Sequence, residues 1–154
     1  MTVEVSPYLE TLPRQGVYLA IGLAPLDERA ICEMDLLLSH SIIDRLLGGE
    51  GEPLTNPRPL TEIEEGVLSY LWLKLLSRIY EEAGGSARVH FRLHQCCSSP
   101  QDFKFSAGAK TIVLSFQIRI GDKAGYARLL FPSPFAQKVF LEPMTDFTAA
   151  EAVF

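Results

Sequence analysis

Three glutamates, Glu62, Glu64 and Glu65, lie close enough in sequence to act in acid–base catalysis or to bind Mg²⁺. Thr61 precedes them, and Thr61 with Glu64 has the spacing of a capping box, in which each side chain bonds the other residue's backbone N–H at a helix start. Carboxylates in a first helical turn are also stabilised by the helix dipole. The spacing therefore predicts the start of a helix, which accounts for all three glutamates without catalysis or a metal.

The basic residues Arg88, His90, Arg92 and His94 alternate with apolar residues, which is typical of a half-buried strand. Two histidines on one face could indicate a metal or anion site. However, four residues of strand separate their attachment points by about 13 Å, whereas both nitrogens must lie ~2 Å from a shared ion. We therefore expect a solvated face, with a partner-binding patch as the alternative. His40, on the apolar side of a predicted helix, is expected to be a satisfied core or interface residue.

The chain has three cysteines, Cys32, Cys96 and Cys97, and neither their odd number nor the adjacent pair is typical of a disulfide framework or a CxxC metal site. A reducing compartment is the simplest inference. Nothing near the pair except His94 would lower a thiol pKa. We therefore expect inert cysteines and no catalytic thiol.

The composition is that of one globular domain, because 47% of the 154 residues are apolar and 21% are charged. The formal net charge of −5 provides no basic surface for phosphates, so we expect protein partners and no nucleic acid. No stretch approaches the ~20 apolar residues that a membrane span requires, and the amino terminus lacks a signal-peptide pattern. The sequence predicts a soluble cytoplasmic protein without membrane insertion.

The segment Gly48-Gly49-Glu50-Gly51 follows a helical pattern over residues 36–47. It lacks the GK[ST] ending of a phosphate loop and follows a helix instead of opening one, so no nucleotide cofactor is expected. Gly48 and Gly49 suit a left-handed helix cap, and a purely structural role explains them as well as a functional one does. Gly51 is left over, and we expect its backbone to turn and expose its own N–H and C=O groups, as in a docking loop.

Two hairpins, two longer helices and one short helix must position these residues. The hairpins come from β-branched and aliphatic runs on either side of turn residues, and the long core helix opens at the capping box and ends at Gly84-Gly85. The expected boundaries are strands 17–23 and 29–35, helix 36–47, loop 50–60, helix 61–83, strand 88–94, strands 112–120 and 126–131 about a turn at 121–125, and a helix capped by Ser133 that runs through Phe140.

A coarse repeat relates the two halves of this order. Each half has a strand, a turn with acidic and basic residues, a return strand and a helix, the turns being Asp27-Glu28-Arg29 and Asp122-Lys123. This repetition favours an α/β sandwich of two similar halves.

Several stretches, taken together and in this order, resemble the middle domain of the flagellar motor switch family FliM. Tyr8–Pro13 resembles the lead-in to that domain, Asp44–Gly51 (DRLLGGEG) resembles the helix that runs into its GGxG loop, and Arg58–Glu64 (RPLTEIE) resembles the start of its long helix. The motifs of the carboxyl-terminal half are less specific, because alternating strands around a glycine turn occur in many folds. The resemblance covers nearly the whole chain.

The resemblance implies a pseudo-two-fold α/β/α sandwich with a mostly antiparallel sheet, related in fold to the CheC phosphatases. It implies a domain over residues 1–144 with a linker or tail at 145–154. In FliM the GGxG loop region binds the rotor protein FliG, and neighbouring FliM copies pack into a ring. Contacts of the whole protein with FliN and phosphorylated CheY are expected to use segments missing from this chain, at the inner face of the cytoplasmic membrane.

By the same resemblance, Gly48, Gly49, Glu50 and Gly51 are the expected partner-binding residues, with Arg58 in the following loop as a supporting candidate. We expect Glu50 and Gly51 to carry the recognition surface, and Gly48 and Gly49 to hold the helix end that presents it. The expected role is binding that transmits the chemotactic switching signal, without catalysis or a cofactor.

Two alternatives keep the same fold. CheC-like phosphatases position a water with a glutamate and an asparagine three residues later, but the residues three after Glu64 and Glu65 are Val67 and Leu68, which cannot orient a water. The related rotor component of type III secretion systems, SctQ, is the other alternative. It is kept because Cys97-Ser98-Ser99 stands where FliM usually has Glu-Ser-Asn.

Overall fold

The structure is a computed structural model of the chain, and it describes residues 2–13, 15–52, 54–84, 89–100, 103 and 109–137. Arg88, Gly85, the expected helix end at Phe140 and the expected tail at 145–154 lie outside these residues.

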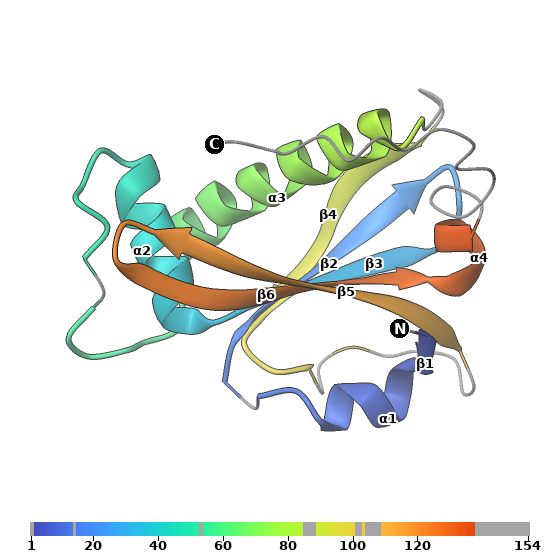
Figure 1. Cartoon of the computed structure of the whole chain (residues 1–154), viewed down its shortest axis with the longest axis horizontal. Coiled ribbons are helices and arrows are strands. Elements are labelled where there is room, and N and C mark those ends of the chain that lie inside the picture. Colours follow the sequence, from blue (N-terminus) through green and yellow to red (C-terminus); the bar gives the residue numbers. More distant parts are fainter. Residues whose placement is uncertain are drawn as a thin grey trace.

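Within the described residues, six strands form one antiparallel sheet in the order β1-β5-β6-β3-β2-β4 (Figure 1). Both predicted hairpins are confirmed, and they meet at the centre of the sheet, where β3 pairs with β6. The strands are β1 (Thr2–Glu4), β2 (Val17–Ala24), β3 (Arg29–Met34), β4 (His90–Cys97), β5 (Lys110–Ile120) and β6 (Lys123–Pro132).

Helices cover both faces of the sheet, which gives three layers (Figure 1). Helices α2 (Leu36–Leu46), α3 (Glu62–Glu82) and α4 (Ser133–Ala136) pack on one face, and α1 (Val5–Glu10) packs on the other. The predicted α/β/α sandwich is therefore confirmed.

Each face of the sheet has its own apolar cluster. Leu19 and Ile21 of β2 point to the larger cluster, together with Trp72 and Leu76 of α3. The smaller cluster joins α1 to the opposite face of the same strands, where Tyr18 is fully buried. Strand β2 is buried on both sides, which is why its sequence is a continuous apolar run without alternation.

The strand order supports the pseudo-two-fold relation between the halves. Strand β1 precedes the first hairpin but pairs with β5 of the second, and β4 precedes β5 but pairs with β2 of the first. Each half therefore contributes an edge strand to the hairpin of the other half.

Several boundaries differ from those expected, and β1 and α1 were not predicted. The second hairpin turns at Gly121-Asp122 alone, and Ile120 already pairs with Lys123, because the positive φ of Gly121 allows a tight two-residue turn. In β4 a bulge opposite Ala20 and Ile21 leaves His94 out of the pairing register, so the strict alternation predicted there ends before His94. The last helix begins at Ser133 itself, with Pro132 in the N-cap position and no side-chain cap hydrogen bond.

Candidate partner-binding loop

Helix α2 precedes the GGEG segment, and the residues just before and just after it, Asp35 and Gly48, set where it begins and ends. Asp35 caps its start, because the Asp35 side chain accepts a hydrogen bond from the Leu38 N–H at 2.9 Å. At the other end Gly48 takes a φ of +96°, a left-handed conformation that an L side chain rarely adopts. The predicted helix end at Gly48 is confirmed, and the chain leaves it as the GGEG loop (residues 48–51).

Asp44, in the last turn of α2, bonds the GGEG loop from the helix side. Its Oδ2 accepts a hydrogen bond from the Gly51 N–H at 2.8 Å, and its backbone C=O accepts one from the Gly49 N–H at 2.8 Å. A Cβ on Gly49 would overlap the Asp44 carboxylate. Glycine at position 49 therefore leaves room for the Asp44 carboxylate, which any larger residue would displace, and glycine is favoured at position 51 by a φ of +80°.

Lys123, at the tip of the β5–β6 hairpin, holds the loop from the other side. Its Nζ donates to the Gly51 C=O at 2.9 Å and forms an ion pair with Glu52 at 3.2 Å. The expectation that Gly51 exposes its backbone groups is therefore wrong. Gly51 is buried and both of its backbone polar groups are bonded within the chain, because Asp44 and Lys123 converge on it.

The exposed part of this loop is Glu50 with the leucines that end α2. The Glu50 side chain is 89% exposed and lies 3.5 Å from Arg45, while Leu46 and Leu47 are 50% and 66% exposed. Large apolar side chains beside an exposed charge are a common composition for a docking surface. The structure thus presents Glu50 to solvent and uses Gly51 as an internal support.

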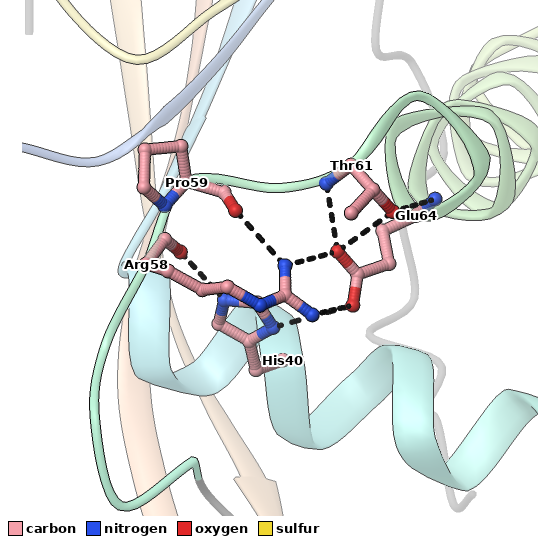
Figure 2. A network of polar contacts seen from close by, with 5 residues as sticks. All are labelled: His40, Arg58, Pro59, Thr61 and Glu64. Atoms are coloured by element: carbon pink, nitrogen blue, oxygen red, sulfur yellow. Dashed lines mark hydrogen bonds and ion pairs between the residues drawn. The ribbon is translucent and has the colours of Figure 1, made fainter.

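Arg58 belongs to a separate polar network at the start of α3 (Figure 2). Its guanidinium donates two hydrogen bonds to the Glu64 carboxylate, at 2.7 and 2.8 Å. Glu64 also accepts from the Thr61 N–H at 2.7 Å, which confirms the predicted capping box. His40 is buried, with Nε2 2.9 Å from the Arg58 carbonyl, and is the satisfied core histidine that was expected.

The same network fixes the charge state of Glu64. Hydrogen bonds from Arg58 and then from Thr61 lower the Glu64 pKa from 4.5 to about 2, against a smaller opposing effect of burial. A carboxylate held ionised in this way is a poor general acid or base near neutral pH. The Arg58 guanidinium is likewise committed to Glu64, so its partner-binding role stays a prediction.

Two of the three thiols, those of Cys32 and Cys96, are not activated. Burial raises the pKa of Cys32 well above its ordinary value, and burial followed by the nearby Glu65 carboxylate raises that of Cys96 to about 12. Within the described part of the chain, no group of three or more His, Cys, Asp or Glu side chains could hold a metal ion.

Asp44 and Lys123 were not singled out from the sequence, although one signal was available for the first. An acidic residue in the last turn of a helix faces the negative end of the helix dipole, which is unfavourable unless another interaction offsets it. Lys123 carries no comparable signal, because 72 residues separate it from the Gly51 carbonyl that it binds.

The comparison with protein families decides the identity of the domain. The family model "Flagellar motor switch protein FliM" matches residues 2–149. This chain belongs to the FliM family. The FliM of Treponema pallidum (strain Nichols) is 27% identical over 126 residues, which are 81% of this chain and 37% of that protein. The chain thus spans well under half the length of this FliM.

Solved FliM structures have the same fold. A chain of the crystal structure of the FliG–FliM complex from H. pylori aligns with a TM-score of 0.74 and 20% identity, covering 86% of this chain and 73% of that one. The FliM middle domain from H. pylori aligns with a TM-score of 0.73 and 18% identity, covering 92% and 76%. Among the described helices, none is long and apolar enough to cross a membrane.

Proposed function

We propose that this domain is a non-enzymatic module of the flagellar motor switch that binds FliG through the surface formed by Leu46, Leu47 and Glu50. The observation that carries the proposal is the GGEG loop itself, which is fixed internally by Asp44 and Lys123 while Glu50 stays 89% exposed. A fixed loop loses little conformational entropy when a partner binds. Support also comes from the fold shared with a FliM chain that was crystallised with FliG.

The wider role is inferred from the family. We infer that the whole protein sits at the cytoplasmic face of the membrane, packs against neighbouring copies in a ring and passes the chemotactic switching signal to FliG. The match to the FliM family favours this flagellar role over the type III secretion alternative. Contacts with FliN and phosphorylated CheY are assigned to other parts of the protein.

A phosphatase activity is disfavoured by the residues on α3. The positions three after Glu64 and Glu65 are Val67 and the fully buried Leu68, which offer no amide to orient a water. Glu64 itself is engaged by Arg58 and Thr61. These observations support a domain that acts by binding.

The loop assignment is tested by reversing the charge of Glu50. Glu50→Lys should weaken FliG binding at least tenfold in a calorimetric titration, because the exposed carboxylate becomes an ammonium without a change in the glycine backbone. Glu10→Lys is the matched control, since Glu10 is an exposed glutamate at the end of α1 on the opposite face of the sheet. Its affinity should stay within about twofold of wild type. Equal affinities for the two variants would refute the assignment.

A further inference from the structure

We propose that Asp44 and Lys123 are positioning residues that hold the GGEG loop in its docking conformation. They do so from two different parts of the fold, α2 and the tip of the β5–β6 hairpin. The proposal rests on the proposed function, because the loop is taken to be the FliG-binding element. It adds two residues that are expected to control affinity through Gly51, without lying on the exposed surface formed by Glu50, Leu46 and Leu47.

Asp44 lies at a position where an acidic side chain is unfavourable unless another interaction stabilises it. It lies in the last turn of α2, where a negative charge is disfavoured by the helix dipole. Its carboxylate is used by the loop, since Oδ2 accepts the Gly51 N–H at 2.8 Å. A charged acceptor makes this a stronger hydrogen bond than a neutral one would. The bond offsets the unfavourable position and ties the loop to the helix end.

Lys123 bonds the other backbone group of Gly51, its C=O, as a hydrogen-bond donor. Gly51 is buried, so its C=O needs a partner, and Nζ of Lys123 supplies one at 2.9 Å. The hairpin tip that carries Lys123 lies beside α2 (Figure 1). Gly51 is thus bonded through its N–H to the Asp44 carboxylate and through its C=O to the Lys123 ammonium. The loop is therefore linked both to α2 and to the hairpin tip.

The close approach of Gly49 to Asp44 gives the proposal a distinctive consequence. A Cβ at position 49 overlaps the Asp44 carboxylate, so Gly49→Ala must push that carboxylate away from the Gly51 N–H. Gly49 has no positive φ that would strain an alanine. Gly49→Ala should therefore act through Asp44, and its effect should vanish when Asp44 is already alanine.

The test measures loop order and affinity separately on the full chain. Asp44→Ala and Lys123→Met each remove one bond to Gly51, and Asp44→Asn keeps an oxygen acceptor at the same place. Glu52→Gln is the matched control, because it removes only the ion pair of Lys123 with an exposed carboxylate. Amide hydrogen exchange of Gly51 is followed by NMR in the free protein, and the FliG dissociation constant is measured by calorimetry.

Asp44→Ala should speed exchange of the Gly51 amide at least tenfold. Both Asp44→Ala and Lys123→Met should raise the FliG dissociation constant about tenfold. This is the change expected if the docking conformation of the loop falls to about a tenth of the population. Asp44→Asn and Glu52→Gln should stay within about threefold. Adding Gly49→Ala to Asp44→Ala should change the affinity no further.

Unchanged exchange in Asp44→Ala would show that the carboxylate does not hold the loop. Faster exchange with wild-type affinity would show that the hold is not used in docking, and either result overturns the proposal. If Glu50→Lys also binds FliG with wild-type affinity, the proposed function is refuted. The exchange rate of the Gly51 amide then still shows whether Asp44 holds the loop. Lys123 lies in a hairpin tip, so Lys123→Met keeps the test informative should Asp44→Ala fold poorly.

Discussion

Glu64 shows how one carboxylate organises a helix start and the loop before it. It accepts hydrogen bonds from Arg58, from the Thr61 N–H and from the Thr61 hydroxyl, so a single side chain joins the end of the 50–60 loop to α3. His40 adds α2 to the same network, because its Nδ1 lies 3.9 Å from Glu64. The loop that follows the GGEG loop is thus anchored at its far end.

The depressed pKa of Glu64 makes this anchor sensitive to acid. Its stabilisation is fully present above the ordinary pKa of 4.5 and is lost as the pH falls toward the folded value of about 2. Glu64→Gln should therefore lower the free energy of unfolding by about 1 kcal/mol at pH 7. The difference between the two proteins should shrink in urea titrations between pH 4.5 and pH 3. A difference that is constant over this range would contradict the account.

The sequence predicted the capping box of this network, but for the GGEG loop it predicted only the end of α2. Thr61 and Glu64 are three residues apart, and their capping role depends only on local spacing. Gly51 is different, because its backbone groups are bonded by Asp44 through the fold of the loop and by Lys123 from a distant hairpin. A pattern of glycines predicts that the chain turns, but it does not say which groups the turn buries.

At the scale of elements, α3 is the main support of the sheet. Its 21 residues present Leu68, Trp72 and Leu76 to the larger apolar cluster, while Tyr70 on the outer side is 64% exposed. Burial of each such core side chain contributes about 1.5–3 kcal/mol. The helix therefore stabilises the face on which α2 and its GGEG loop are carried.

Two substitutions in α3 compare the contribution to stability of a buried residue with that of an exposed one. Leu76→Ala should lower the free energy of unfolding by about 2–5 kcal/mol, because Leu76 is 1% exposed and its removal leaves a cavity. Tyr70→Ala on the same helix should cost less than about 1 kcal/mol. Chemical denaturation measures both. Similar losses for the two variants would mean that the helix packs through a different face.

Most elements were predictable because their patterns are local. The hairpins, α2 and α3 follow from apolar periodicity, prolines and caps. The bulge at His94 and the tight turn at Gly121 were not predicted, since each depends on how the neighbouring strand is paired. The strand exchange of β1 and β4 between the halves is a tertiary feature, and neither the coarse repeat nor the family resemblance specified it.

At the scale of the whole molecule, the two halves meet at strands β3 and β6, and a partly buried ion pair lies at this junction. Glu33 and Arg128 are paired in register, with Nη1 of Arg128 2.7 Å from Oε2 of Glu33. Burial raises the Glu33 pKa, and the hydrogen bond and charge of Arg128 oppose that shift. The pair thus compensates a carboxylate that is 3% exposed at the centre of the sheet.

Removing one partner of this pair should destabilise the junction. Arg128→Met should lower the free energy of unfolding by about 3–5 kcal/mol, because it leaves Glu33 buried without its cation. Arg45→Met, which removes an arginine from an exposed ion pair, should cost less than about 1 kcal/mol. Thermal and urea unfolding measure both changes, and an equal small cost would show that the central pair does not hold the halves together.

FliG is expected to touch this domain at the GGEG loop. An NMR titration of the isotope-labelled chain with unlabelled FliG measures this most directly, because every amide reports its own environment. The account predicts that the largest shifts fall on residues 46–52 and on Lys123, with little change in α1 on the opposite face. Large shifts in α1 with an undisturbed GGEG loop would contradict it.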